Sequence, residues 1–437
     1  MIQRSRLVVL RSRLVVLLLA LAFVGAACGQ KSGVAGTEVA TGGGGGGGAE
    51  PAGPSGPHEP GADDTSGVTD SEIVIGVHAP VTGASPLPQE TFDIGKDIYW
   101  NFLAGSDPEA LGGRQARVVF RDDEFNPRRA VQVCREMVEQ ENAFILIGGG
   151  GADQITACAQ FAAEAGVPYF SAGVNESGLA DLSTYFALSL TYAQQGPLIA
   201  EQLQELDIER VGVVVADTPS FGDGHDGFVE AAEDAGLEIV TDEEINKNAS
   251  EAEALSAVQA LRDADAEAVF ILTSPLVYLS LASGARNQGY EPIFIGPGIT
   301  SGLNQVLEFG CPGTGNGQFF SPFPELDVID ELDPDYLAAY EEFGRGNEAD
   351  DIGLALWGLN KTIATMFEAT LAAGDLGRAA LMNTIESGDR FESGVFPPVT
   401  YTTDDPFGGT GAHLLVADCG SRQYMTEGQF VELSDGE

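Results

Sequence analysis

The sequence has few basic side chains for its length. Its 437 residues include 21 Lys and Arg against 66 Asp and Glu, a formal net charge of −45. Nucleic-acid binding depends on clustered Lys and Arg that neutralise phosphates, so this composition argues strongly against a nucleic-acid partner. The acidic residues are dispersed along the chain, as on solvated helix faces, and salt screens the self-repulsion of such a surface.

Histidine and cysteine are also scarce, which limits the enzyme and metal chemistry that the chain can offer. No GxSxG, HExxH, CxxC or Cys/His cluster is present, so neither a cofactor nor a metal is expected. The adjacent acids Asp122 and Asp123 follow a strand pattern and are expected to cap a turn rather than to act as an acid–base pair. An α/β hydrolase is therefore only a lesser alternative. The four histidines are His58, His78, His225 and His413.

Residues 1–27 have the composition of a secretory signal. Four arginines precede an uncharged run at residues 14–27, and this run is short for a helix that spans a membrane permanently. Small residues stand directly before Cys28, and the arrangement resembles a bacterial lipobox, in which that cysteine receives lipid and becomes the new N-terminus. We expect Cys28 to be lipidated, and ordinary secretion with a free Cys28 is the alternative.

Residues 28–71 lack the side chains that a core requires. Between residues 31 and 71 there is no Leu, Ile, Met, Phe, Tyr or Trp, and a glycine run occupies 42–48. Such a segment buries too little apolar surface to offset the entropy lost on ordering. We predict a disordered, Gly/Pro-rich tether over 28–71 that holds the folded part off a membrane surface.

From residue 72 onward, apolar strand patterns alternate with helical ones. EIVIGVHAPV, ARVVFRDD and FILIG have the near-continuous apolar character of buried strands, and the segments between them have helical spacing. Asn126 followed by Pro127 predicts a helix start, and Gly166 a helix end. This order predicts an α/β fold with parallel sheets covered by helices on both faces.

The rest of the chain repeats the alternation. The uncharged stretch at 268–285 is divided by Ser274 and Pro275, so a strand, a turn and a helix fit it better than a membrane span. More than 360 residues follow the tether, which favours two domains.

Eight stretches, taken in order, resemble the type 1 periplasmic-binding-protein family and its branched-chain amino-acid (Leu/Ile/Val) subfamily. They are IVIGVHAPVTG, FRDDEFNPRRAV, ILIGGGGADQITA, AGVPYFSAGVN, AQQGP, VVVADTPSFGDG, ARNQGYEPIFIGPG and PPVTYTTDD. The resemblance implies two doubly wound Rossmann-like lobes with ligand in the cleft between them. It implies three crossovers, near 190–193, 320–323 and 394–398. The expected lobes are 72–191 plus 322–395 for lobe 1, and 192–321 plus 396–437 for lobe 2.

The resemblance also implies a function. The chain is expected to be an exported substrate-binding lipoprotein on the outer face of the cell membrane, and a monomer. Its expected partners are a small-molecule ligand, the permease subunits of an ABC importer and, through the lipid, the membrane. A ligand-sensing receptor of the same fold is the alternative.

The ligand contacts implied by the family fall on loops of this chain that match the family's own. Family members have Ser or Thr where this chain has Ala152 and Asp153, and amino-acid-binding members carry an acid near Gly298. Asp153 is expected to cap the helix that follows the glycine loop. This incomplete clamp favours a weakly charged or apolar ligand, such as an amide, an aromatic acid or an amino-acid-like molecule. The expected contacts are Ser85, Pro86, Ala152, Asp153, Gln154, Gly173, Val174, Asn175, Phe221, Ser274, Gly298 and Thr300.

Four cysteines remain after Cys28 and allow three pairings in an exported chain. Cys134 and Cys158 lie on successive helices, which pack side by side on one face of a doubly wound sheet. The resemblance returns Cys419 to the lobe that contains Cys311. We therefore predict the pairs Cys134–Cys158 and Cys311–Cys419, with buried free thiols as the alternative.

The lipid assignment predicts the effect of changing one residue. Replacing Cys28 with Ala removes the attachment point and should release the protein from the membrane fraction into the medium. Fractionation followed by immunoblotting measures this. A variant that stays in the membrane fraction like the parent would contradict the assignment.

Overall fold

A computed structural model of the chain describes residues 63–171, 176–298 and 302–433. The expected signal at 1–27, Cys28 and most of the expected tether lie outside the described residues. Within these ranges, no helix has both the length and the apolar character needed to cross a membrane.

Lobe 1 is built on a parallel five-stranded sheet with the order β2-β1-β3-β4-β5. Alternate side chains of the first strand enter different cores: Ile73 and Ile75 join one cluster, and Val74 joins the other. The strands are β1 (Glu72–Ala79), β2 (Gln115–Asp122), β3 (Ile145–Gly148), β4 (Tyr169–Ser171) and β5 (Tyr185–Ala187).

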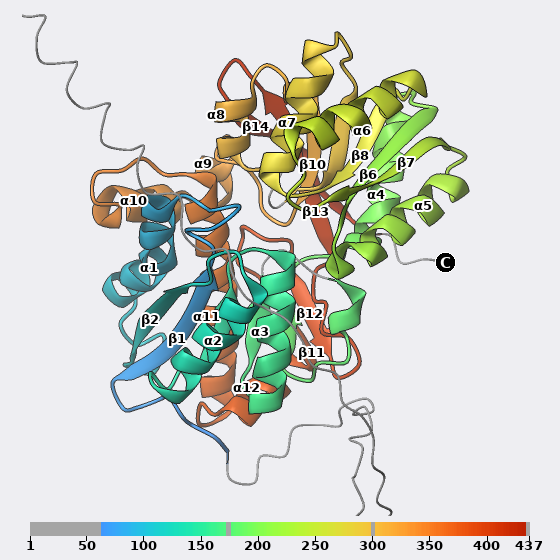
Figure 1. The fold of residues 1–437 in the computed structure, drawn as a ribbon. Coiled ribbons are helices and arrows are strands. Elements are labelled where there is room, and N and C mark those ends of the chain that lie inside the picture. Colours follow the sequence, from blue (N-terminus) through green and yellow to red (C-terminus); the bar gives the residue numbers. More distant parts are fainter. Residues whose placement is uncertain (1–62, 172–175, 299–301, 434–437) are drawn as a thin grey trace, which may run out of the picture. The chain divides into compact units, whose positions relative to one another are not determined.

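Helices cover both faces of this sheet, as the alternation of patterns predicted. Figure 1 shows that α11 and α12, which come late in the chain, lie in the same lobe as α1 near its start, and α11 packs on α1. One face carries α1 (Gln89–Ser106), α11 (Asp351–Ala373) and α12 (Arg378–Ile385), and the other carries α2 (Pro127–Glu139) and α3 (Ala152–Ala165). The smaller elements of lobe 1 are η1 (Ser177–Leu179), α9 (Ile329–Leu332), α10 (Pro334–Phe343), β11 (Ser387–Phe391) and β12 (Val399–Thr402).

The predicted helix boundaries in this lobe are confirmed. The Asn126 side chain accepts hydrogen bonds from the backbone N–H groups of Arg128 and Arg129, at 3.0 and 3.3 Å, and Pro127 is the first residue of α2. Gly166 ends α3 in the left-handed conformation, with φ 66°.

Lobe 2 contains a seven-stranded sheet with the order β14-β13-β10-β9-β8-β6-β7. All neighbours are parallel except the pairs β10–β13 and β13–β14. Its strands are β6 (Arg210–Asp217), β7 (Glu238–Asn246), β8 (Ala268–Leu272), β9 (Ile293–Pro297), β10 (Gly317–Ser321), β13 (Gly411–Asp418) and β14 (Gln423–Glu432). Its helices are α4 (Tyr192–Glu205), η2 (Pro219–Phe221), α5 (Gly222–Asp234), α6 (Glu251–Asp263), α7 (Pro275–Asn287) and α8 (Asn304–Gly310).

The third connection between the lobes comes later in the chain than expected. Val399 and Tyr401 of β12 are buried in the core of lobe 1, and β12 pairs with β11. Beyond β12, the backbone of Ala187 in β5 bonds to Pro406 and Gly408, at 2.9 and 3.0 Å. The prediction that residues 396–408 belong to lobe 2 is therefore wrong. The alternating pattern of this segment marks a strand, but it does not indicate which core the strand completes.

The folded part also begins earlier than the predicted end of the tether. Asp63 accepts hydrogen bonds from the first backbone N–H groups of α12, at Ala379 and Ala380, and Asp64 pairs with Arg378. The Arg378 guanidinium in turn donates to the backbone carbonyl of Ala143, at 2.8 Å. Residues 63–71 thus belong to lobe 1. The low apolar content of residues 63–71 did not predict this attachment, because carboxylates and a guanidinium make it.

Two disulfides are present. Cys134 of α2 is bonded to Cys158 of α3, and Cys311, after α8, is bonded to Cys419, after β13. These are the pairs predicted from the sequence. Each disulfide joins segments of a single lobe, so neither restrains one lobe relative to the other.

A buried polar cluster joins lobe 2 to the start of α11. Asn304 of α8 donates its backbone N–H to Asp351 Oδ2, at 2.6 Å, and its side-chain N–H to Glu325 Oε2, at 2.8 Å. Burial, with the charge of Asp350, raises the pKa of Asp351 to about 6. Burial, with the charge of Asp351, raises the pKa of Glu325 well above its ordinary value. In this contact between the lobes, the carboxyl groups of Asp351 and Glu325 therefore bind protons more readily than free carboxyl groups do.

The Cys311–Cys419 disulfide predicts a loss of stability when it is removed. It closes a loop with a sequence separation of 108 residues. The double change Cys311→Ala and Cys419→Ala should therefore lower the free energy of unfolding by about 4–5 kcal/mol in the chain-entropy description. Chemical denaturation measures the loss, and peptide mapping without reductant checks the pairing. A variant as stable as the parent would contradict the predicted loss. A peptide from the parent protein that joins Cys311 to Cys134 would contradict the pairing.

The buried acid Asp351 predicts a pH dependence of stability. Its folded pKa of about 6 lies above the ordinary 3.8, so its contribution is full below pH 4 and is lost as the pH rises through 6. The loss amounts to about 2–3 kcal/mol. Asp351→Asn should remove it, so the variant gains stability relative to the parent between pH 4 and pH 7.5. Thermal or chemical denaturation across this range tests the gain, with the exposed Asp330→Asn as control. Parallel pH profiles for Asp351→Asn and the parent would refute it.

Candidate functional site

A cavity of about 360 Å³ lies between the two lobes. It is lined at the points where strands of both sheets end: Gly148 at the end of β3, Ala216 near the end of β6, and Thr273 just after β8. Ligands of open α/β sheets bind beyond the carboxyl ends of the strands. The cavity is thus the candidate binding site.

Most of the cavity wall is apolar. Helix α11 contributes Ile352, Ala355, Leu356 and Leu359, which lie on one face of the helix at spacings of three and four residues. Lobe 2 adds Leu276 of α7 and Phe309 of α8, whose exposed fractions are 51% and 69%. The exposed part of the wall therefore also carries large apolar side chains.

A glycine loop forms another part of the wall. Residues 148–151 join β3 to α3, and they line the cavity together with the first turn of the helix. Gly151 has φ 79°, and a Cβ there would lie 2.3 Å from Gln154 Oε1. A side chain at this position would be strained and would clash. The loop thus brings backbone and a helix N-terminus, which favours partial negative charge, to the cavity.

Asp153 provides a polar contact between the lobes at the same place. Its Oδ2 lies 2.6 Å from Lys247 Nζ, just after β7, and its Oδ1 accepts hydrogen bonds from the hydroxyls of Thr218 and, at 3.2 Å, Ser220. All three donors belong to lobe 2, whereas Asp153 belongs to α3 of lobe 1. The prediction that Asp153 caps α3 is wrong. The N-cap residue is Gly151, and the donors of lobe 2 take the carboxylate instead.

These donors keep the carboxylate charged. Burial alone would raise the pKa of Asp153, but the hydrogen bonds from Lys247 and Thr218, the Lys247 charge and the Ser220 hydroxyl outweigh burial. The pKa of Asp153 is therefore lower than the ordinary value. Among the described residues that line the cavity, Asp153 is the one acid and Lys247 the one base.

Two further acids lie near this ion pair. Asp223 of α5 accepts hydrogen bonds from the backbone N–H and hydroxyl of Ser177, at 2.7 and 3.0 Å, which forms another contact between the lobes. Glu176 is half-buried, and burial, together with the charges of Asp223 and Asp153, raises its pKa. The surroundings of the Asp153–Lys247 pair are therefore acidic.

The structure brings many of the expected ligand contacts to one cavity. Gly298 is an exception: its N–H bonds to the Phe320 carbonyl at 2.6 Å, and it does not line the cavity. The close approach of β10 takes up the space around Gly298, and a ligand contact there stays a prediction. The expected contacts Gly173, Val174, Asn175 and Thr300 lie outside the described residues. Those on the cavity wall are Ser85, Pro86, Ala152, Asp153, Gln154, Phe221 and Ser274.

Sequence reasoning missed the basic member of the ion pair and the stripe of α11. Lys247 follows the end of a strand and is one of only 21 basic residues, which is a signal that could have singled it out. The spacing of Ile352, Ala355, Leu356 and Leu359 is visible in the sequence. That spacing is shared by any face that packs into a core, so it does not distinguish a cavity wall.

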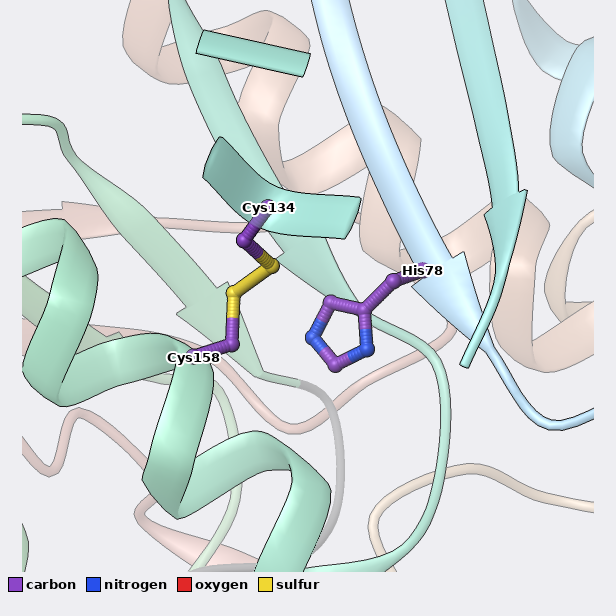
Figure 2. A group of neighbouring side chains, drawn as sticks. All are labelled: His78, Cys134 and Cys158. Atoms are coloured by element: carbon purple, nitrogen blue, oxygen red, sulfur yellow. A yellow bond between two sulfur atoms is a disulfide. The ribbon is translucent and has the colours of Figure 1, made fainter. Parts of the chain in front are cut away.

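A buried group lies under the glycine loop. Figure 2 shows the His78 ring beside the disulfide between Cys134 and Cys158. The disulfide occupies both sulfur atoms. The two ring nitrogens of His78 lie 2.8 Å from Asp123 Oδ2 and 2.8 Å from the Tyr169 hydroxyl. These internal contacts make His78 a packed histidine.

The adjacent acids at the end of β2 organise turns, as predicted. Asp122 Oδ1 accepts hydrogen bonds from the backbone N–H groups of Val81 and Glu124, at 3.1 and 2.9 Å. Asp123 Oδ1 accepts from the N–H of Phe125 at 3.0 Å, and its Oδ2 contacts His78. Together they position the loop after β1, which carries Ser85 and Pro86 to the cavity.

Comparisons with known proteins agree with this arrangement. A curated "Amino acid binding protein" of Pseudomonas aeruginosa is 26% identical over 164 residues, 35% of this chain and 41% of the relative, so the chain spans about two fifths of that relative. The structure of a fatty acid ABC transporter substrate-binding protein from Thermomonospora curvata has a TM-score of 0.72 at 20% identity, covering 84% of this chain and 94% of the other. A solute-binding protein of an ABC transporter from R. palustris, in complex with 4-hydroxybenzoate, has a TM-score of 0.70 at 17% identity, covering 83% and 96%.

The solved structures share the two-lobe α/β fold. Residues 72–418, which include most of both lobes, match the family described as periplasmic binding protein. The chain belongs to the type 1 periplasmic-binding-protein family.

Proposed function

We propose that the protein is the substrate-binding component of an ABC importer and that it captures a small, largely apolar molecule between its lobes. The observation that carries this proposal is the cavity of about 360 Å³ with a predominantly apolar wall and a single polar end. Small-molecule sites have this composition, in which apolar walls provide affinity and a few polar groups fix orientation.

The wall of α11 supports an apolar ligand in particular. Ile352, Leu356 and Leu359 give the ligand an apolar surface to pack on, and the exposed side chains of Leu276 and Phe309 would lose contact with water when a ligand body covers them. Each 100 Å² of apolar surface removed from water in this way contributes about 2.5 kcal/mol. A free amino acid would bring an ammonium and a carboxylate to a site whose described walls hold one acid and one base that already pair with each other.

Two of the structural neighbours point in the same direction. They are a fatty acid transporter protein and a complex with 4-hydroxybenzoate, and fatty acids and 4-hydroxybenzoate both have a substantial apolar body. We infer an aliphatic or aromatic body for the ligand of this chain. Binding rather than catalysis is supported by the histidines, since His78, His225 and His413 do not line the cavity.

The proposal includes the location and the partners. We propose export, lipidation at Cys28 and a monomer that delivers ligand to permease subunits. Two features support it: residues 1–27 have the composition of a secretory signal, and the contacts of Asp63 and Asp64 attach the N-terminal segment to lobe 1.

The position of Ala355 on the cavity wall predicts that a large side chain there weakens ligand binding. Ala355→Trp places an indole in the cavity and should weaken binding of a co-purifying ligand by about tenfold or more, because the space is lost. Native mass spectrometry of the protein as purified, followed by denaturation and identification of the released small molecule, measures this. Ala372→Trp, on an exposed position of the same helix, is the matched control. Equal ligand occupancy in the two folded variants would argue against the cavity as the site.

A further inference from the structure

We propose that Asp153 and Lys247 form a built-in ion pair between the lobes, and that this pair makes the cavity selective for a ligand with an uncharged polar group on its apolar body. The inference rests on the proposed function and narrows it to a class of head group, such as a carboxamide, an alcohol or an ester.

The site already contains one negative and one positive group that balance each other. Asp153 and Lys247 approach within 2.6 Å and line the same cavity, with the acid on lobe 1 and the base on lobe 2. Asp153 is further held by Thr218 and Ser220, so both of its oxygens have donors. A charged ligand would have to share or break this pair, and a broken pair leaves a charge without a partner in a partly buried site.

A carboxylate ligand faces an additional penalty from its surroundings. Asp223 and Glu176 do not line the cavity, but Glu176 feels the charges of both Asp223 and Asp153, and Lys247 is the one base among the described lining residues. The whole chain has a formal net charge of −45, which adds to the unfavourable potential for an anion. A second carboxylate beside Asp153 would therefore be repelled by these charges, and it would have to compete with Asp153 for Lys247 and for the N-terminus of α3.

An ammonium ligand is disfavoured for a different reason. The Asp153 carboxylate already accepts from three donors, so it offers an incoming ammonium only one further acceptor position, on Oδ2 beside the Lys247 ammonium. The Lys247 ammonium lines the same wall and repels a second cation. A charged ligand of either sign is therefore disfavoured at this site, an anion by Asp153 and its acidic neighbours and a cation by Lys247.

An uncharged polar group, in contrast, finds partners without disturbing the pair. The polar residues of the wall include Ser85, Thr218 and Ser274, together with the backbone of the glycine loop. The hydroxyls of Thr218 and Ser274 donate to Asp153 and to the Lys247 carbonyl, and their oxygens can still accept. Hydroxyls both donate and accept, so they match an amide or an alcohol. Burying a neutral polar group with such partners costs far less than burying an ion.

The test is a matched series of ligands that differ only in the head group. Decanamide, decanoate and decylamine share one aliphatic tail, and benzamide, benzoate and benzylamine share one aromatic body. Each is titrated at pH 7 as a competitor of the neutral fluorescent probe N-phenyl-1-naphthylamine, with the full chain carrying Cys28→Ala. In at least one series, the amide should bind about tenfold more tightly than the carboxylate and the amine, a difference of 1.4 kcal/mol.

Two variants test whether the ion pair is the cause. Asp153→Asn keeps the shape and leaves Lys247 unpaired, so the preference for amide over carboxylate should shrink by about tenfold or reverse. Lys247→Gln leaves Asp153 unpaired and should shrink the preference for amide over amine in the same way. Lys361→Gln is the control, because it removes a Lys–Asp pair within lobe 1 that is not on the cavity wall. It should leave all ratios unchanged.

The outcomes separate this inference from the proposed function. If the probe binds and a carboxylate or an amine equals the amide, or if Asp153→Asn and Lys247→Gln leave the ratios of the parent, the role of the ion pair is overturned while the apolar cavity stands. If neither the probe nor any compound binds to the folded protein, the proposed function fails, and this inference fails with it.

Discussion

The burial of α11 is the constraint on which both the core of lobe 1 and the candidate site depend. The helix follows the parallel part of lobe 2 in the chain, yet it packs on α1 and places Trp357 and Ile363 in the core of lobe 1. A helix that is apolar on nearly every side must be covered on nearly every side. The core covers part of α11, and the face that carries Ala355 and Leu356 remains for the cavity. The apolar character of the site is therefore a consequence of how lobe 1 is closed.

Two of the polar contacts between the lobes treat charge in opposite ways. Asp153 meets an ammonium and two hydroxyls, and it stays ionised despite its burial. Asp351 and Glu325 meet the amide groups of Asn304, and burial favours their protonated forms. Since a neutral amide cannot compensate a buried negative charge as a cation does, the second contact is the one that senses pH. The lobes are thus held at one place by a salt bridge and at another by hydrogen bonds that depend on bound protons.

Features set by neighbouring residues were predictable from the sequence, and features set by distant segments were not. The start of α2 at Asn126 and Pro127 follows from local cap chemistry, and the Cys134–Cys158 pair follows from the packing of successive helices. Asp153 looked like a cap because the residues that bind it, Thr218 and Lys247, lie 65 and 94 positions away. The strand at β12 was recognisable, but its place in the core of lobe 1 depends on β11 and β5, and no periodicity encodes that choice.

The attachment of the N-terminal segment determines how force would pass through the molecule. Asp63 and Asp64 bind the start of α12, and Arg378 carries the connection onward to the backbone of Ala143 and Phe144, next to β3. A pull applied upstream of Asp63 would therefore be borne by lobe 1, through a helix terminus and a guanidinium clamp, before it reached β1. Lobe 2 would carry none of this load directly. Lobe 1 is thus the part of the molecule that would bear such a load, and lobe 2 would feel it only through lobe 1.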